Sequence, residues 1–77
     1  MIMTNNTIEE REFYSAIFEK YQNLLTQTQK QALYLHLFED LSYSEIAKEL
    51  ATSRSAAFDA VKKAKQKLLK FNKKISE

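Results

Sequence analysis

The sequence predicts an all-α fold, a small helical domain that ends in a long basic helix. Its 77 residues include no glycine and no proline, the residues on which hairpin turns and phosphate-cradling loops depend. Apolar residues recur every three or four positions along most of the chain, which is the period of an amphipathic helix. Serine or threonine also stands three residues before glutamate or glutamine at the start of three predicted helices, the spacing of a helix-capping box.

The composition excludes several classes of protein. The chain has no cysteine and one histidine, which excludes a disulfide framework and a histidine–cysteine metal cage and fits a reducing cytoplasm. We find no secretory leader in "MIMTNNTIEE", and "ALYLHLF", the longest apolar run, is too short to cross a membrane. We therefore expect one cytoplasmic domain over residues 1–77, flexible at residues 1–6, with no cofactor, no metal and no membrane insertion.

The first half of the chain predicts two helices. One follows the capping box at Thr7 and runs to about residue 23, with four apolar or aromatic residues on one face. These are Tyr14, Ile17, Phe18 and Tyr21. A second helix begins near residue 27, after the capping box at Thr26, and packs through Leu33, Leu37 and Leu41. We expect His36 to be exposed beside this stripe, and Asp40 to end the helix in the left-handed conformation.

The second half predicts two more helices joined by a tight turn. The third capping box, at Ser42, opens a short helix from residue 43 to about residue 50. Ser53 then caps a last helix that begins at Arg54 and can continue to about Ile75. Ala51 stands in the turn, where glycine or asparagine is usual, so it either adopts a positive φ or the turn differs.

This pair of helices has the features of a helix-turn-helix. Ala47 is small enough to let the second helix cross the first closely, and apolar neighbours can lock the crossing. Ser53, Arg54 and Ser55 place donors at the start of the last helix, where Arg54 can pair with the acceptor edge of guanine. Lys62 and Lys63, further along, suit phosphate contacts. The alternative is a helical hairpin of similar spacing that binds nothing.

Charge is distributed unequally between the two halves of the chain. Residues 1–50 hold four cations and eight acids, a net −4, whereas residues 51–76 hold Arg54, seven lysines and Asp59, a net +7. Together with Glu77 this gives the overall charge of +2. A segment this basic predicts a polyanionic partner, most simply a nucleic acid. The alternative is a solvated helix face with no such partner.

Apolar residues continue along the last helix at alternating spacings of four and three. The seam consists of Ala57, Val61, Ala64, Leu68, Phe71 and Ile75. Its first part locks the helix-turn-helix, and its last part needs another surface. That surface is either the aromatic face of the first helix or a second copy of the chain. We favour a homodimer, whose predicted interface is Leu68, Phe71, Ile75, Tyr14 and Phe18.

Residues 24–69, "LLTQTQKQALYLHLFEDLSYSEIAKELATSRSAAFDAVKKAKQKLL", resemble the YlxM-like family of small bacterial helix-turn-helix proteins. That family is similar to the C-terminal promoter-recognition domain of sigma factors. The blocks "DLSYSEIAKEL" and "SRSAAFDAVKK" carry the resemblance. It implies an all-α cytoplasmic protein with a DNA-binding motif, associated with the signal recognition particle pathway. Ser55 replaces a glutamine usual in the family, and Thr52 and Ala57 replace valines, so we expect backbone contacts to outweigh base reading.

The resemblance completes the set of candidate nucleic-acid-binding residues. These are Ser42, Tyr43, Ser53, Arg54, Ser55, Asp59, Lys62 and Lys63. The function predicted is that of a non-enzymatic DNA-binding regulatory protein, with RNA as the alternative ligand and components of the signal recognition particle as further partners. The second hypothesis is a protein-interaction adaptor of the targeting machinery that uses the motif as a scaffold. We expect no enzyme, because no nucleophile–base pair, metal set or carboxylate dyad can be assembled.

Overall fold

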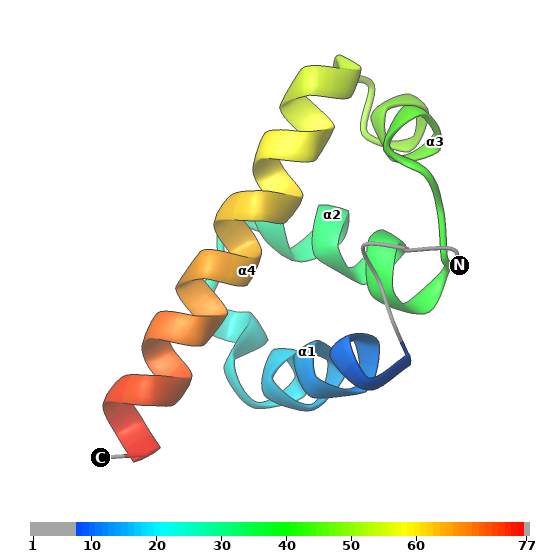
Figure 1. Ribbon diagram of the computed structural model, residues 1–77. Coiled ribbons are helices and arrows are strands. Elements are labelled where there is room, and N and C mark those ends of the chain that lie inside the picture. The colour runs from blue at the N-terminus through cyan, green and yellow to red at the C-terminus, as the bar shows by residue number, and fades with distance from the viewer. Residues whose placement is uncertain (1–7, 77) are drawn as a thin grey trace.

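The computed structural model describes residues 8–76, and this part of the chain is all-α, as predicted. It contains four α-helices and one 3₁₀ turn: α1 (Ile8–Tyr21), η1 (Gln22–Leu24), α2 (Gln27–Phe38), α3 (Tyr43–Glu49) and α4 (Arg54–Ser76). The expected flexible residues 1–6 and the capping box at Thr7 lie outside the described residues. Figure 1 shows α4 as one long straight helix, with α3, α2 and α1 placed in that order along it from its N-terminal end.

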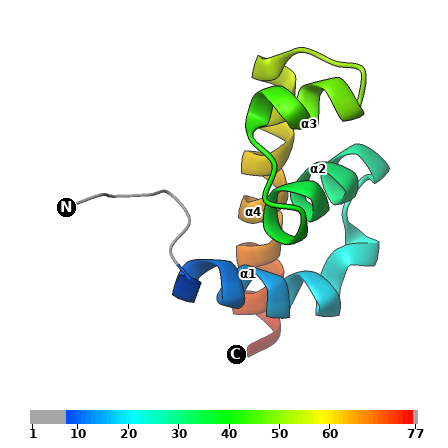
Figure 2. The same cartoon turned by 90° about the vertical axis from the view of Figure 1, so that its right-hand side faces the viewer.

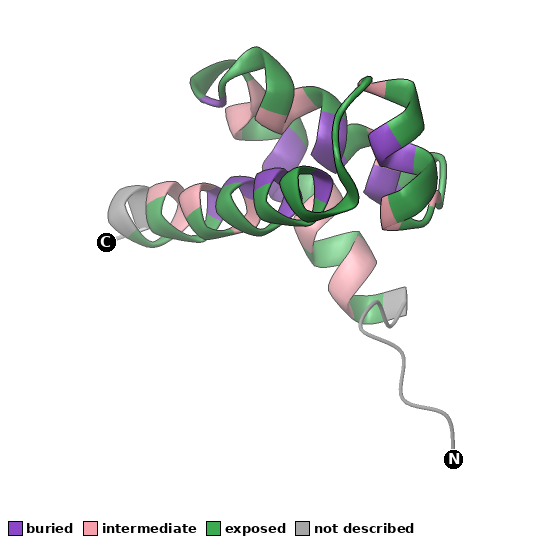
Figure 3. Ribbon diagram, turned by 90° about the horizontal axis from the view of Figure 1, so that it is seen from above, coloured by how far each residue is buried: buried purple, intermediate pink, exposed green. Residues whose placement is uncertain are grey.

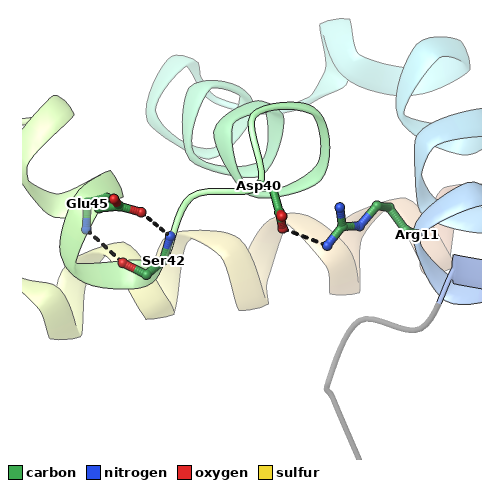
Figure 4. A network of polar contacts seen from close by, with 4 residues as sticks. All are labelled: Arg11, Asp40, Ser42 and Glu45. Atoms are coloured by element: carbon green, nitrogen blue, oxygen red, sulfur yellow. Dashed lines mark hydrogen bonds and ion pairs between the residues drawn. The ribbon is translucent and has the colours of Figure 1, made fainter.

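Reciprocal capping boxes fix the starts of α2 and α3. At α2, the Thr26 hydroxyl accepts from the Gln29 amide at 3.1 Å, and the Thr26 amide donates to the Gln29 side chain at 3.2 Å. At α3, the Ser42 hydroxyl accepts from the Glu45 amide at 3.2 Å, and the Ser42 amide donates to the Glu45 carboxylate at 2.9 Å (Figure 4). Both boxes confirm the predicted helix starts, because they satisfy amides that the first turn leaves without a partner.

The end of α1 differs from the prediction in its winding. We expected one helix to about residue 23, whereas α1 ends at Tyr21 and the chain tightens into η1. The Leu25 amide donates to the Gln22 carbonyl at 3.1 Å, a bond across three residues rather than four. The tighter turn accompanies the burial of Leu25 in the core, which helical periodicity alone does not anticipate.

The core lies between α4 and the other three helices. Figure 2 shows α3, α2 and α1 stacked in front of α4, and Figure 3 shows the buried positions of α4 on the side that faces them. Four side chains are the largest that are fully buried: Leu33, Ile46, Val61 and Leu68. They come from α2, α3 and α4, so one continuous apolar cluster joins these helices.

The seam of α4 is covered by the same chain. Leu68 is fully buried and Phe18 is only 3% exposed, so neither is available to a second copy. Their assignment to a dimer interface was therefore wrong, because both side chains lie in the core of one chain, where the Phe18 ring packs against Tyr34 and Phe38 of α2. The side chain of Ile75 lies outside the described residues.

The aromatic face of α1 supplies that intrachain surface. The ring of Tyr21 lies 6.3 Å from the ring of Phe71, and the Lys65 ammonium lies 5.0 Å from the centre of the Tyr14 ring. A cation over an aromatic face is attracted by the electron density of the ring. Tyr14 and Phe71 remain half-buried. The homodimer itself stays a prediction. Among the described residues of its predicted interface, Tyr14 and Phe71 are the ones that remain partly accessible.

His36 is buried, so the expectation of an exposed histidine was wrong. The residue is 8% exposed, and its ring stacks on Tyr43 at 5.4 Å and 8° between planes. The start of α3 thus covers a position that lies beside the main stripe of α2. The pKa of His36 is lowered to about 4, mainly by burial and also by the charges of Lys65 and Arg11, which together outweigh the opposite effect of Asp40.

Acidification should therefore destabilise the fold through His36. Its pKa is near 6.5 in the unfolded chain and about 4 in the folded one, so the unfolded chain binds more protons between these values. The contribution is fully present above pH 6.5 and falls as the pH drops towards 4, by about 2 kcal/mol between pH 7 and pH 5. Urea unfolding of the native protein and His36→Phe at both pH values measures it. Equal losses of stability in the two proteins would contradict the assignment.

Candidate nucleic-acid interface

The start of α4 is exposed and capped. The Ser53 hydroxyl accepts from the Ala56 amide at 3.1 Å, and the Ser53 carbonyl accepts from the Ala57 amide at 2.9 Å. This confirms Ser53 as the cap residue. Arg54 and Ser55 follow it and are both exposed. The helix N-terminus adds a partial positive charge, so this end of α4 favours an anion such as phosphate.

The turn between α3 and α4 keeps its shape without glycine. Ala51 adopts φ 54°, so of the two possibilities left open by the sequence, the structure shows the positive φ. The Thr52 amide donates to the Ala47 carbonyl at 2.9 Å, and the Ala51 amide donates to the Lys48 carbonyl at 3.3 Å. These two bonds form a Schellman motif, which satisfies the last carbonyls of α3. The hydrogen bonds hold alanine in a conformation that costs an L-residue about 1–2 kcal/mol.

The preceding turn, between α2 and α3, also uses a residue of positive φ. Asp40 has φ 58°, as expected for a residue that tolerates the left-handed region, and its carboxylate pairs with Arg11 of α1 at 2.8 Å (Figure 4). The Leu41 amide donates to the Leu35 carbonyl at 3.2 Å. The ion pair therefore joins α1 to the turn that precedes α3, next to the Ser42 cap.

The crossing of α3 and α4 is locked by the residues predicted for it. Ile46 and Ala57 are fully buried, Val61 is 1% exposed and Ala47 is 6% exposed. The small side chains of the two alanines allow the helices to approach closely. The opposite face of α4 is thereby turned to solvent, which is the arrangement that a recognition helix requires.

The exposed side of α4 carries rows of residues set by the helical repeat. Ser55, Asp59 and Lys62 recur at intervals of four and three and are all exposed. Asp59 and Lys63 form an exposed ion pair with 3.2 Å between the carboxylate and the ammonium. We assign little stability to it, because exposed pairs contribute less than about 1 kcal/mol.

A second row of lysines borders the start of α2. Lys63, Lys67 and Lys70 recur at intervals of four and three and, together with Gln29 and Gln66, line a shallow hollow of about 290 Å³. Ammonium groups and side-chain amides both donate to phosphate oxygens. This row lengthens the cationic surface beyond the residues predicted from the motif.

Tyr43, Arg54 and Ser55 meet at the start of α4. They line a hollow of about 370 Å³ together with Phe58, which the sequence reasoning did not select. Phe58 is 47% exposed although it is a large apolar side chain. The signal in the sequence was an aromatic residue one position off the buried seam of α4. Ser42, also predicted, is exposed beside Tyr43, and its hydroxyl oxygen already accepts the capping bond.

A metal site and a membrane span are both absent from residues 8–76. No three histidine or acidic side chains gather there in a way that could hold a metal ion. In the same residues, no helix is both long and apolar enough to cross a bilayer. The basic face of α4 is the part of this region whose chemistry points to a ligand.

Comparison with known proteins places the chain among helix-turn-helix proteins. A family model described as "Putative helix-turn-helix protein, YlxM / p13 like" matches residues 8–76. The chain is similar to a UPF0122 protein of Mycoplasma capricolum, with 40% identity over 75 residues, 97% of this chain and 66% of that protein. It is also similar to one of Bacillus cereus, with 39% identity over 59 residues, 77% of this chain and 54% of that protein. The chain thus spans about two thirds of the length of the Mycoplasma protein and about half the length of the Bacillus protein. No solved structure matches the chain.

Replacing Ala51 by glycine should stabilise the domain. Glycine adopts positive φ without the steric penalty of a Cβ, and this gain exceeds the extra entropy of the unfolded chain. We expect the free energy of unfolding to rise by about 0.5–1 kcal/mol, measured by urea unfolding. Ala16→Gly, at an exposed position within α1, is the matched control and should lower it by about 1 kcal/mol. A loss of stability in Ala51→Gly would show that φ is not the limiting feature of the turn.

Proposed function

The chain belongs to the YlxM/p13-like family of helix-turn-helix proteins, and we propose that it is a non-enzymatic DNA-binding regulatory protein. The observation that carries the proposal is the exposed start of α4, where Ser53, Arg54 and Ser55 stand opposite a fully packed face. An α-helix of this kind fits the major groove of duplex DNA. The family is described by its structural motif and not by a reaction.

The distribution of charge supports duplex binding through the phosphate backbone. Seven lysines of residues 51–76 lie on α4, whereas residues 1–50 are net acidic. Lys62 is exposed on the face that includes Ser55, and the row of Lys63, Lys67 and Lys70 borders it. Phosphate contacts of this kind determine affinity and register, and base contacts determine preference. Arg54 is the residue we assign to guanine.

The protein-interaction adaptor is the second candidate function. Phe13, Tyr34 and Phe38 are exposed on α1 and α2, and the rings of Tyr34 and Phe38 lie 5.1 Å apart. Exposed apolar side chains that lie together favour a protein partner. From the resemblance to the YlxM-like family, we propose that this protein partner belongs to the signal recognition particle pathway. We also propose that the protein is located in the cytoplasm.

Capture from a nuclease-treated lysate separates the two functions. An adaptor should retain its protein partner after nucleic acid is destroyed, lose it in Phe38→Ser, and keep it in Arg54→Ala. A DNA-binding protein should instead lose duplex binding in Arg54→Ala and keep it in Phe38→Ser. Retention of the same partner by Phe38→Ser would remove the observation that favours the adaptor.

Two substitutions on α4 should affect DNA binding differently. Selection from a random duplex pool supplies the probe, and fluorescence anisotropy at several salt concentrations measures affinity. Arg54→Ala should weaken binding to the selected duplex by about 1–3 kcal/mol and flatten its sequence preference. Lys62→Ala should weaken all duplexes alike and reduce the slope of log affinity against log salt by about 0.9.

The matched control is Lys20→Ala, which removes the same charge from an exposed position on α1. It should leave both preference and slope unchanged. A structured RNA hairpin tests the alternative ligand in the same assay. If no duplex binds even at low salt, DNA binding is refuted, and if Lys20→Ala acts like Lys62→Ala, the proposed face is not the one used.

A further inference from the structure

A stack of three rings links the core to the surface at the start of α4. The buried His36 ring of α2 lies parallel to the Tyr43 ring at 5.4 Å. The Tyr43 ring meets the Phe58 ring of α4 edge to face, at 5.1 Å and 83°. Both arrangements are favoured for aromatic pairs and add to the stabilisation from burial. The stack therefore holds the Phe58 ring in place from beneath, although that ring is 47% exposed.

The exposed ring lies beside the residues assigned to base contact. Arg54 and Phe58 are four residues apart, so they lie one above the other on the same side of α4. With Tyr43 and Ser55 they line the hollow of about 370 Å³. The hollow thus combines an apolar wall formed by two rings with a guanidinium and a hydroxyl at its edge.

This combination matches one feature of the major groove. The 5-methyl group of thymine is the apolar group that base pairs present there, and phenylalanine is among the side chains that contact it. A side chain carried by a helix in the groove meets the edges of paired bases, where this methyl group lies. We propose that Phe58, supported by Tyr43, is a specificity-determining residue that contacts the thymine methyl group; this inference rests on the proposed entry of α4 into the major groove.

The assignment gives the interface a second base-reading side chain. Ser55 and Ala56 are too short to reach far into a groove, which would leave Arg54 as the only long reader at the start of α4. Phe58 follows Arg54 by one helical turn, a rise of about 6 Å, or close to two base-pair steps. The preferred duplex therefore contains a thymine near the guanine that Arg54 contacts.

Replacing thymine by deoxyuridine tests this inference directly. Two DNA hairpins in which guanine and thymine recur two base pairs apart are compared, identical except that one carries deoxyuridine at every thymine. The exchange removes the methyl group and leaves the base pairing and the minor-groove edges unchanged. The native protein should bind the thymine hairpin about fourfold more tightly, the change expected for one buried methyl group. Phe58→Ala should bind both hairpins with equal affinity.

Two further variants and an RNA hairpin complete the experiment. Leu69→Ala truncates another exposed apolar side chain of α4 and should keep the preference of the native protein. Phe58→Leu, which retains an apolar side chain, should prefer thymine more than Phe58→Ala does. Even if Phe58→Ala unfolds, which circular dichroism would reveal, the comparison of the two hairpins by the native protein still tests whether the thymine methyl group is contacted at all.

Different results would overturn the thymine contact and the proposed DNA binding. Equal binding of both DNA hairpins by the native protein overturns the thymine contact and leaves DNA binding intact. Absence of binding to either DNA hairpin at low salt overturns both, and so does binding to the RNA hairpin alone. A thymine preference that persists in Phe58→Ala shows that another residue makes the contact.

Discussion

Burial of one face of α4 is the constraint on which the rest of the structure depends. The chain contains no cysteine, so this domain is held together by packing, caps and polar contacts rather than by disulfides. α1, α2 and α3 all pack against α4, and its most deeply buried positions, Ala57, Val61, Ala64 and Leu68, are four or three residues apart. Any side chain on the opposite face of α4 is consequently positioned by the core. The buried face of α4 thus holds the fold together, and the exposed face of the same helix carries the candidate site.

Local signals were sufficient to predict the elements of the fold. Capping boxes at Thr26 and Ser42 mark helix starts because their bonds lie within four residues, and the apolar period identifies the face that each helix buries. The positions of Arg54 and Ser55 at the exposed start of α4 could be predicted for the same reason. Leu68 illustrates the limit: its seam shows that a partner surface exists, but not whether it belongs to the same chain.

The features that the sequence did not reveal depend on contacts between helices. His36 is buried because the start of α3 lies over it, and Phe58 matters because Tyr43, fifteen residues earlier, supports its ring. No periodicity within α2 or α4 encodes these neighbours. Both residues belong to one ring stack, so the largest error about the core and the largest omission from the site have the same physical origin.

The Schellman turn at Ala51 has a consequence for the energetics of recognition. Its hydrogen bonds, together with the Ser53 cap, fix the direction in which α4 leaves α3 before any ligand arrives. A binding surface that is already ordered loses little conformational entropy on association. Whatever deformation an imperfect fit requires must then come from the partner. The domain would therefore discriminate between duplexes partly by their flexibility, because a stiff sequence resists adapting to a rigid helix pair.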